Sequence, residues 1–462
     1  MSVLAAFHAL HSSTMKWAQT RWLGFILQFP AQMALALLTE VPIYNGICST
    51  AGVYNTSFTP ADLPWNTYNY CNAPHVNAAH YEVPGNAPDA TLVYLNAMVR
   101  HHKRTPDNLY PEEGELNQEP WNCSSFLQFN HGGGTTHIFH ETYSPPWHPF
   151  LVQIWNGTCD EGQLTYEGLQ DAIHHGEDFW SVYAGKLEFL KSVNEDDIFI
   201  RTSVADRTYQ VAGGLLTGMD PTMATKTFPV LTQPSAIDSI VPDYSCPNAD
   251  SIRDAYQSVP TWSDHLEENA GLQDRLCTML GVTGNTAWTS WYDHFFDTFS
   301  SRTCHGHALP CNASGACVTV EDAARVFAIG DWEYNYIWNT AENATTYSQL
   351  TFGVFFMELA HNFRMFRSGG ETHKLRFYVG HDGSMIRLAS LLGLGKVAPL
   401  RWPAMGSEII MEVWKTTAGE QYVRIMHEGT TVPGLEWLAL DDFIDMLEAQ
   451  VPPNVFAACM GS

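Results

Sequence analysis

Two short motifs carry side chains that could act together on a phosphate ester. The first is Arg100-His101-His102-Lys103-Arg104-Thr105-Pro106, which follows an apolar run at 92–99. Guanidinium groups match phosphate oxygens with paired donors, and a neutral imidazole nitrogen can attack phosphorus and carry the group covalently. The second is Gly380-His381-Asp382-Gly383, after the apolar run 375–379. It adds another imidazole and a carboxyl group that could protonate a leaving oxygen.

The apolar runs indicate strands that position these motifs. We predict strands at 91–99, 198–200 and 375–379, a late hairpin at 408–414 and 421–427, and helices at 165–190, 211–219 and 440–448, with another after Ser384. Strands that alternate with helices favour an α/β core with a largely parallel sheet. In such a sheet, ligands bind beyond the carboxyl ends of the strands, which is where both motifs fall.

The composition limits the classes of partner. The chain has 462 residues and a net charge of −26, from 49 acidic and 23 basic residues, and 45% of its residues are hydrophobic. A negative surface repels nucleic acid and anionic membranes, so we expect no nucleic-acid partner. The hydrophobic fraction supports a packed core. The sequence does not determine an oligomeric state.

Cysteines and sequons favour the secretory pathway. The ten cysteines are scattered without a CxxC pair, and five Asn-x-Ser/Thr sequons stand at positions 55, 122, 156, 312 and 343. This combination predicts disulfides and a secreted, vacuolar or cell-surface glycoprotein. Residues 1–40 contain a single acid, Glu40, and an interrupted apolar run. They are interpreted as a signal peptide, an anchor or an N-terminal arm, which leaves the membrane question open.

The chain resembles the histidine acid phosphatases, which form branch 2 of the histidine phosphatase superfamily. Their signature Arg-His-Gly-x-Arg-x-Pro stands here as residues 100–106, with His102 in place of the glycine. The segment 201–207 resembles the one that carries a third phosphate-binding arginine, here Arg207, and Gly162 to Thr165 resembles the helix start before it. Gly380-His381-Asp382 matches the late His-Asp pair, and Glu408 stands where the family often has an acid. The chain looks nearest to lysophosphatidic acid phosphatase-like members.

The resemblance implies a fold. It is a three-layer α/β/α core with a mostly parallel sheet, like that of phosphoglycerate mutase, plus an inserted, mainly helical cap. On this basis we place the first part of the core at 41–227, the cap at 228–368 and the second part of the core at 369–462.

The resemblance also implies a two-step hydrolysis of a phosphate monoester. His101 attacks phosphorus and becomes phosphohistidine, and Asp382 protonates the leaving alcohol. The phosphoryl oxygens are held by Arg100, Arg104, Arg207 and His381. No metal and no cofactor is required, because the arginines supply the positive charge.

Several alternatives stay open at this point. His102 could be tolerated sterically, could contact the substrate or could misplace His101, and Glu408 is either a site residue or an ordinary strand position. The substrate could be a small or amphiphilic monophosphate, lysophosphatidic acid, an aryl or indolyl phosphate, phytate or a phosphosugar. The rival functions are a mutase-like transferase, a membrane-anchored lipid phosphatase and a non-catalytic extracellular anion-binding protein.

Overall fold

The computed structural model describes residues 51–461 apart from 86–87, 118, 124–127, 131–136, 140–142, 144 and 150–153. All of the described residues belong to the unit Ile43–Ser462. The signal, anchor or arm predicted for residues 1–40 lies outside the described residues.

A mixed sheet forms the centre of this unit. Its strand order among the described residues is β10-β8-β7-β1-β6-β4-β5, and β9 pairs with β8. Pairing is parallel from β1 through β6 and β4 to β5, and antiparallel from β1 through β7 to β8. The strands are β1 (Thr91–Arg100), β4 (Ile198–Thr202), β5 (Val230–Thr232), β6 (Leu375–Gly380), β7 (Glu408–Lys415), β8 (Gln421–His427), β9 (Thr430–Thr431) and β10 (Leu438–Ala439). A separate hairpin pairs β2 (Gln128–Asn130) with β3 (His137–Phe139).

Strand β1 lies in the middle because both of its faces are apolar. Leu95, Ala97 and Val99 are buried in the hydrophobic cluster that includes α2 and α3, whereas Tyr94 and Met98 are buried in the cluster that includes α9 and α10. Alternate residues of a strand point to opposite faces, so one continuous apolar run can hold two helical layers. Full burial of each large side chain contributes about 1.5–3 kcal/mol relative to exposure.

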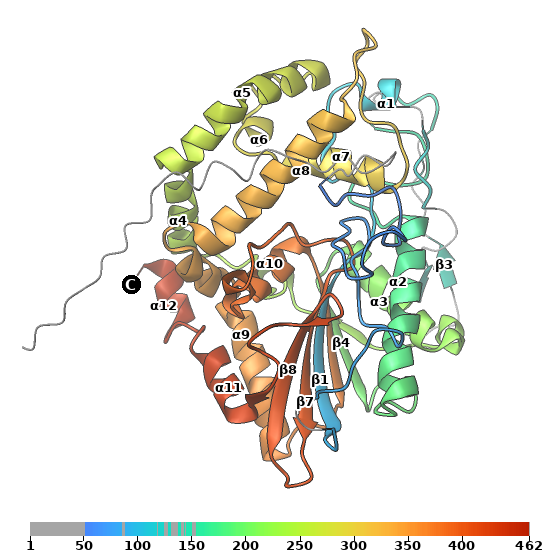
Figure 1. Cartoon of the computed structure of the whole chain (residues 1–462). Helices are drawn as coiled ribbons and strands as arrows, with labels where there is room; N and C mark the ends of the chain where they lie inside the picture. Colours follow the sequence, from blue (N-terminus) through green and yellow to red (C-terminus); the bar gives the residue numbers. More distant parts are fainter. Residues whose placement is uncertain are drawn as a thin grey trace, which may run out of the picture. The chain divides into compact units, whose positions relative to one another are not determined.

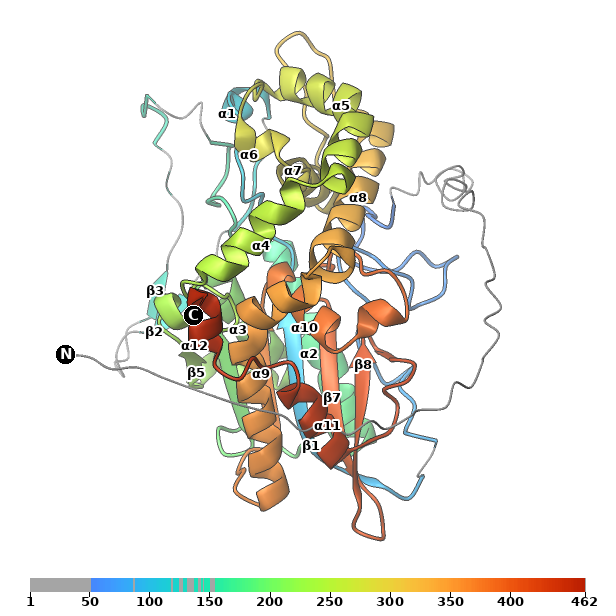
Figure 2. The same cartoon turned by 90° about the vertical axis from the view of Figure 1, so that its left-hand side faces the viewer.

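Helices cover both faces of the sheet. The hydrophobic cluster on one face contains α2 and α3, and the cluster on the other contains α9, α10 and α11 (Figures 1 and 2). The predicted α/β fold with a phosphoglycerate mutase-like core is confirmed. The expected parallel arrangement holds for β5, β4, β6 and β1, and the predicted late hairpin, β7–β8, makes the whole sheet mixed. These helices are α2 (Tyr166–Trp180), α3 (Asp206–Met219), α9 (Ala344–Ser368), α10 (Asp382–Leu391) and α11 (Leu440–Glu448).

A further group of helices lies at the end of the sheet where β1 ends (Figure 1). It comprises α4 (Pro247–Gln257), α5 (Pro260–Leu280), α6 (Thr286–Thr289), α7 (Asp293–Cys304) and α8 (Val320–Asn335). The cap boundaries 228–368 remain a prediction. Within that range, α9 packs against the sheet, since the ring of Phe355 lies 5.1 Å from that of Tyr378 in β6. The remaining short helices are α1 (Glu113–Leu116) and α12 (Val455–Met460).

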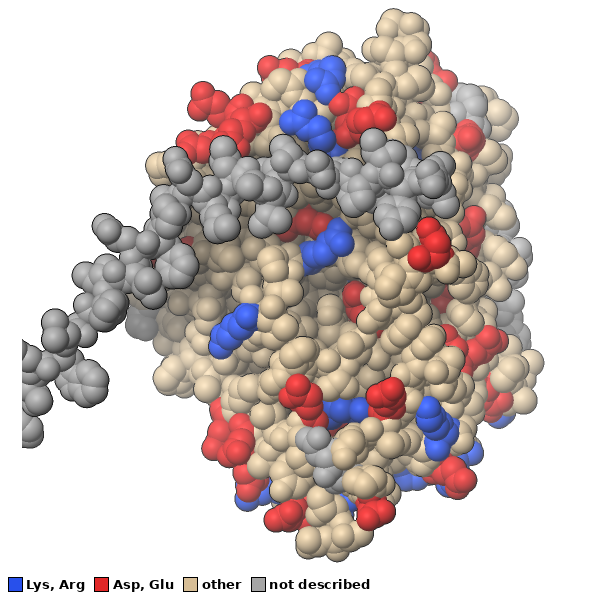
Figure 3. All heavy atoms as spheres, viewed as in Figure 1, with Lys and Arg blue, Asp and Glu red and all other residues tan. Residues whose placement is uncertain are grey.

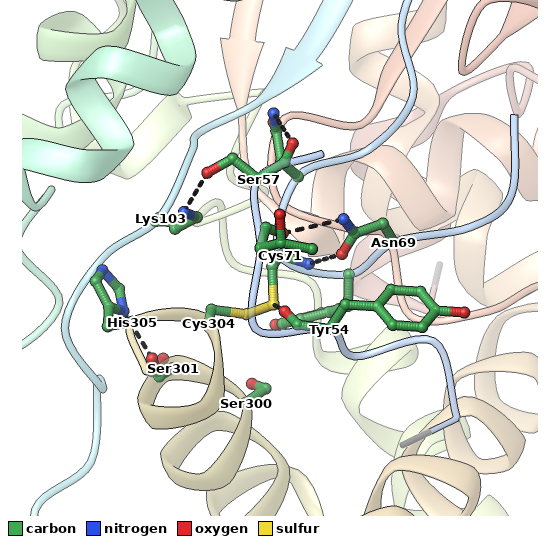
Figure 4. The surroundings of a disulfide bond; sticks show 12 residues. Tyr54, Ser57, Asn69, Cys71, Lys103, Ser300, Ser301, Cys304 and His305 are labelled. Atoms are coloured by element: carbon green, nitrogen blue, oxygen red, sulfur yellow. Dashed lines mark hydrogen bonds between the residues drawn. A yellow bond between two sulfur atoms is a disulfide. The ribbon is translucent and has the colours of Figure 1, made fainter. Parts of the chain in front are cut away.

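Four disulfides form among the described residues, as the cysteine content predicted, and two of them join distant segments. Cys71–Cys304 joins the segment before β1 to the end of α7 (Figure 4), and Cys246–Cys459 joins α4 to α12. The other two are Cys123–Cys159 and Cys311–Cys317. Near the first bridge, the Lys103 ammonium donates to the Ser57 hydroxyl at 2.6 Å (Figure 4). The loop after β1 is therefore braced by the N-terminal segment.

The surface carries few basic side chains. On the face shown in Figure 3, acidic side chains occur at both ends and in the middle, with basic side chains scattered among them. This distribution is consistent with the net charge of −26. Among the described residues, no helix combines the length and the apolar character that a membrane span requires.

Candidate active site

Both predicted motifs lie at the carboxyl ends of neighbouring parallel strands, β1 and β6. Arg100, the last residue of β1, is fully buried, and its Nη2 lies 3.0 Å from Oδ2 of Asp382, the first residue of α10. The same guanidinium donates to the carbonyl of Pro403 and, at 3.4 Å, to the hydroxyl of Tyr70. Strands β1 and β6 pair in parallel register from Leu95 to Arg100. The two motifs that follow these strands therefore lie next to each other.

His101 is held in one orientation by two backbone contacts. Its own N–H donates to the carbonyl of Gly380 at 3.0 Å, and its ring Nδ1 lies 2.9 Å from the carbonyl of His102. Only a protonated Nδ1 can donate there, so Nε2 carries the free electron pair. Burial, followed by the charges of Arg207 and Arg100, holds the pKa of His101 well below its usual value. The imidazole is therefore neutral and nucleophilic across the physiological pH range.

Arg104 and Arg207 meet at one carboxylate, that of Asp107. Asp107 Oδ2 lies 2.7 Å from Arg104 Nη2, and its Oδ1 lies 3.6 Å from Arg207 Nη1. Arg207 also donates to the carbonyl of Gly162 at 3.1 Å. Arg104 makes a second ion pair, at 2.9 Å, with Asp297 of α7. Asp297 of the helical group thus holds Arg104, a predicted phosphate-binding residue, in place.

The start of α2 is built against the same loop. Thr165 caps the helix, because its hydroxyl accepts the N–H of Gly168 at 3.2 Å, and its own N–H donates to the carbonyl of Lys103 at 3.1 Å. A Cβ at Gly168 would lie 2.0 Å from that carbonyl oxygen. Glycine at 168 is therefore required for α2 to approach the loop that follows β1.

His381 and Asp382 occupy the turn between β6 and α10. His381 is the N-cap residue of α10, and its Nε2 lies 2.8 Å from the hydroxyl of Ser203, just after β4. Its ring centroid is 5.3 Å from that of His101. Burial and the charge of Arg207 lower the pKa of His381 to about 3. His381 is thus a neutral hydrogen-bonding partner beside His101, not a second positive charge.

Asp382 is held as a carboxylate by its donors. Burial would raise its pKa, but the charge of Arg100 and the indole N–H of Trp402, which donates to Oδ2 at 2.9 Å, together lower the pKa well below its usual range. Trp402 is itself fixed between two aromatic rings, those of Phe296 and Tyr334, each with its centroid 3.9 Å away. For Asp382 to act as an acid, a bound ligand must therefore first offset the positive charge around it and raise its pKa.

The cluster reaches solvent along one side. The side chains of Asp382 and Arg207 are 21% and 22% exposed, and that of Asp107 is 34% exposed, whereas Arg100 and His101 are almost fully buried. Two surface pockets, one beside Phe58, His75 and His174 and the other beside Tyr68, Ile386 and Val397, are not lined by these groups, although the second pocket includes Trp402 and Pro403, which contact Asp382 and Arg100. An anion site needs donors rather than volume, and the donors converge in the cluster.

His102 and Glu408, the two further residues predicted for the site, do not join this cluster. His102 Nε2 lies 3.3 Å from Nδ1 of His175 in α2, and His175 Nε2 lies 3.1 Å from Glu408 Oε2. Glu408 Oε1 accepts the N–H of Val76 at 2.6 Å. The two residues therefore belong to a buried imidazole–carboxylate network on the α2 side, where they contact protein and not the arginine cluster.

The structure also explains how histidine replaces the family's glycine. The φ angle of His102 is not positive, so its backbone has no need of glycine. The space for its ring comes from Gly406, which has a φ of 69° and where a Cβ would lie 2.7 Å from His102 Nε2. Steric tolerance is the alternative that this geometry favours.

Sequence reasoning missed several residues that complete the cluster. Asp107, Asp297, Trp402, Tyr70 and Ser203 each contact one of the predicted site residues. Asp107 follows the signature directly, so its proximity was a usable signal. Ser203 lies within the predicted segment 201–207, whereas Asp297, Trp402 and Tyr70 carry no local pattern. Arg201, the other arginine of that segment, pairs with Glu358 of α9 at 2.7 Å.

Comparison with known proteins agrees with this geometry. The profile of the histidine phosphatase superfamily (branch 2) matches residues 91–428. Counting factor 60 of Dictyostelium discoideum is 26% identical over 418 residues, which cover 85% of this chain and 93% of that protein. Lysosomal acid phosphatase of Bos taurus is 25% identical over 320 residues, or 64% of this chain and 72% of that protein.

A solved structure shows the same fold at low sequence identity. The phytase of Citrobacter braakii has a TM-score of 0.54 at 13% identity, and the match covers 79% of this chain and 99% of that one. Fold and site together define a phosphatase of the α/β class. More specifically, the chain belongs to branch 2 of the histidine phosphatase superfamily.

Proposed function

We propose that this chain is a metal-independent acid phosphomonoesterase that acts through a phosphohistidine at His101. The observation that carries the proposal is the state of His101: its Nδ1 lies 2.9 Å from a backbone carbonyl, and its ring is neutral among three arginines. Nε2 attacks phosphorus, the P–O bond to the alcohol breaks, and Asp382 gives its proton to the leaving oxygen. Water then attacks the phosphohistidine, with Asp382 accepting the proton.

The low pKa of Asp382 suggests where its proton comes from. The free site pairs the Asp382 carboxylate with Arg100 at 3.0 Å. A phosphate monoester has a second pKa near 6, so below that pH it arrives as a monoanion. Its negative charge neutralises the arginines and raises the pKa of Asp382, which can then take the substrate's own proton. This balance predicts an acid optimum, with the rate falling above about pH 6.

The surroundings of the arginines favour a substrate with one phosphate group. Asp107 bridges Arg104 and Arg207, and Glu161, beside Gly162, has a pKa raised by burial and by the nearby charges of Asp160 and Asp107. Additional phosphates on the substrate would meet these carboxylates. Such repulsion disfavours phytate and supports a small or amphiphilic monophosphate, which includes aryl phosphates and lysophosphatidic acid.

One comparative assay tests both the proposed class of enzyme and the proposed class of substrate. An aryl phosphate, lysophosphatidic acid, a phosphosugar and phytate are compared between about pH 4 and 8, each with and without chelator. We expect hydrolysis of the aryl phosphate, an acid optimum, no effect of chelator on the initial rate, and a kcat/KM at least about tenfold lower for phytate, which corresponds to 1.4 kcal/mol. Rate loss on chelation would refute the metal-independent mechanism, and efficient phytate hydrolysis would refute the substrate class.

We also propose that the protein passes through the secretory pathway. Four disulfides among the described residues support this, as do the exposed side chains of Asn55, Asn122, Asn156 and Asn343 within sequons. Mobility on a gel before and after glycosidase treatment, for protein made in eukaryotic cells, tests it. An unchanged mobility would argue against glycosylation.

A further inference from the structure

We propose that His75, His174 and Asp178 form a binding site for one divalent metal ion of the zinc class, separate from the phosphatase centre. Among the described residues, each of the three offers one ligand atom, and these atoms all lie within 4.8 Å of one another. His174 and Asp178 stand four residues apart on α2 and therefore on one face of that helix. His75 comes from the segment before β1. The proposed ion would link these two parts of the chain.

The spacing of the ligand atoms fits a tetrahedral ion. Asp178 Oδ2 lies 3.0 Å from His75 Nε2 and 3.6 Å from His174 Nε2. For zinc bonds of roughly 2.0–2.1 Å, a tetrahedron separates neighbouring ligands by about 3.3 Å. The two separations lie on either side of that value. The side chain of His174 is 43% exposed, so a small rotation of its ring can complete the geometry.

The ring of His75 is already oriented as in metal-binding histidines. Its Nδ1 lies 3.1 Å from the carbonyl of Ala73 and its Nε2 faces Asp178. A hydrogen bond from the distal ring nitrogen to a backbone carbonyl is the usual outer contact of a histidine ligand, because it fixes the orientation of the ring. The ion would take the place of the proton through which Nε2 contacts Asp178 in the free protein. The flat contact with His175, whose ring centroid lies 4.2 Å away, holds the ring plane as well.

A pocket of about 650 Å³ lies in front of the three side chains. It is lined by all three, together with Ser57, Asn72 and Ser181. The pocket supplies an entry path and room for a water molecule as the fourth ligand. Two imidazoles and one carboxylate suit zinc better than calcium or magnesium, which prefer oxygen ligands.

Calorimetric titration of the full chain with Zn²⁺, after treatment with chelator, tests the site. We expect one Zn²⁺ per chain to bind in wild type with an affinity at least about tenfold above that of His174→Ala and of Asp178→Asn. The matched control is His80→Ala. His80 lines the same pocket but stacks on Trp65, with ring centroids 4.4 Å apart, and its removal should leave the affinity unchanged.

A second measurement separates binding from folding. Zn²⁺ should raise the Tm of wild type and of His80→Ala but not that of His174→Ala, because a ligand stabilises only a state that binds it. Turnover of an aryl phosphate by His174→Ala confirms that the variant is folded. Equal Zn²⁺ affinity in wild type, His174→Ala and Asp178→Asn, or no saturable binding in wild type, would overturn the proposal. Neither result depends on the phosphatase mechanism.

Discussion

Two adjacent histidines at the end of β1 lie in opposite environments. His101 lies near the charges of Arg100, Arg104 and Arg207, and its ring centroid is 5.3 Å from that of His381. His102 points to α2, where it meets His175 and, through it, Glu408. Burial lowers the pKa of both rings, but the charges that add to this effect come mainly from guanidinium groups for His101 and from other imidazoles for His102.

The difference teaches that residue type alone does not define a site. The His101 side keeps several charged donors beside partly exposed groups, as an anion-binding centre requires. The His102 side is completely enclosed, and its polar atoms largely pair among themselves, as buried polar groups must. We therefore expect the first region to carry the chemistry and the second to hold the loop that follows β1 in place.

Substitution at the two histidines should give the sharpest contrast. His101→Ala removes the proposed nucleophile, and we expect kcat to fall by at least about 10⁴-fold, with no phosphoenzyme trapped after a denaturing quench at alkaline pH, where phosphohistidine is stable. His102→Gly restores the family residue and should leave kcat within about tenfold, because the backbone carbonyl that orients His101 remains. Comparable losses in both variants would contradict the division into two regions.

Asp382→Asn should reduce the rate according to the leaving group. An amide cannot donate the proton that an alkoxide needs, so we expect a loss of about 10²–10⁴-fold with alkyl phosphates. The loss should be much smaller with nitrophenyl phosphate, whose leaving oxygen needs little protonation. Steady-state rates on both substrates measure the effect. An equal loss on both would assign Asp382 to binding instead of proton transfer.

Glu408→Gln tests the enclosed region through stability. Burial raises the pKa of Glu408 to about 7, whereas the unfolded carboxyl titrates near its ordinary value of about 4.3. Between these two pH values the folded state binds more protons, so the group's contribution to stability falls as pH rises, by up to about 4 kcal/mol in total. Denaturant unfolding from pH 4.5 to 7.5 should show this slope in wild type. Its persistence in Glu408→Gln would exclude Glu408 as the cause.

Trp402→Phe should have the smallest effect, on the pH profile. The indole N–H stabilises the Asp382 carboxylate at 2.9 Å, so its loss should raise the pKa of Asp382 and extend activity toward higher pH. We expect less than about a tenfold change in kcat at the optimum, because hydrogen bonds to charged groups are worth about 1.5–3 kcal/mol and Arg100 remains. A profile identical to that of wild type would show that the indole does not influence Asp382. Retained binding of inorganic phosphate serves as the folding control.

Local sequence patterns were sufficient to predict part of the fold and part of the site. The apolar runs at 92–99 and 375–379 became neighbouring parallel strands, and the polar motifs after them meet because parallel strands end at one edge. Arg207, which the family resemblance predicted, lies near Arg104, because the carboxylate of Asp107 contacts both side chains. The predicted roles of these residues in catalysis stay predictions until the variants are assayed.

Other features had no local signal. Nothing near Asp297 or Trp402 in sequence indicates that these side chains contact Arg104 and Asp382. The side chains of His102 and Glu408 pointed away from the cluster for reasons that lie in α2 and at Gly406. These outcomes depend on how the helical layers pack against the sheet, which a single sequence does not reveal.

By itself the sequence indicated the family, the strands that carry the two motifs, and candidates for the nucleophile and the phosphate-binding arginines. These follow from short patterns, because strand periodicity and residue chemistry are local properties. Only the tertiary structure decided which charges surround each group, and therefore that His101 is neutral, that Asp382 is ionised in the free site and that Glu408 lies apart. Burial and Coulomb interactions act through space, so they are set by packing and not by neighbours along the chain.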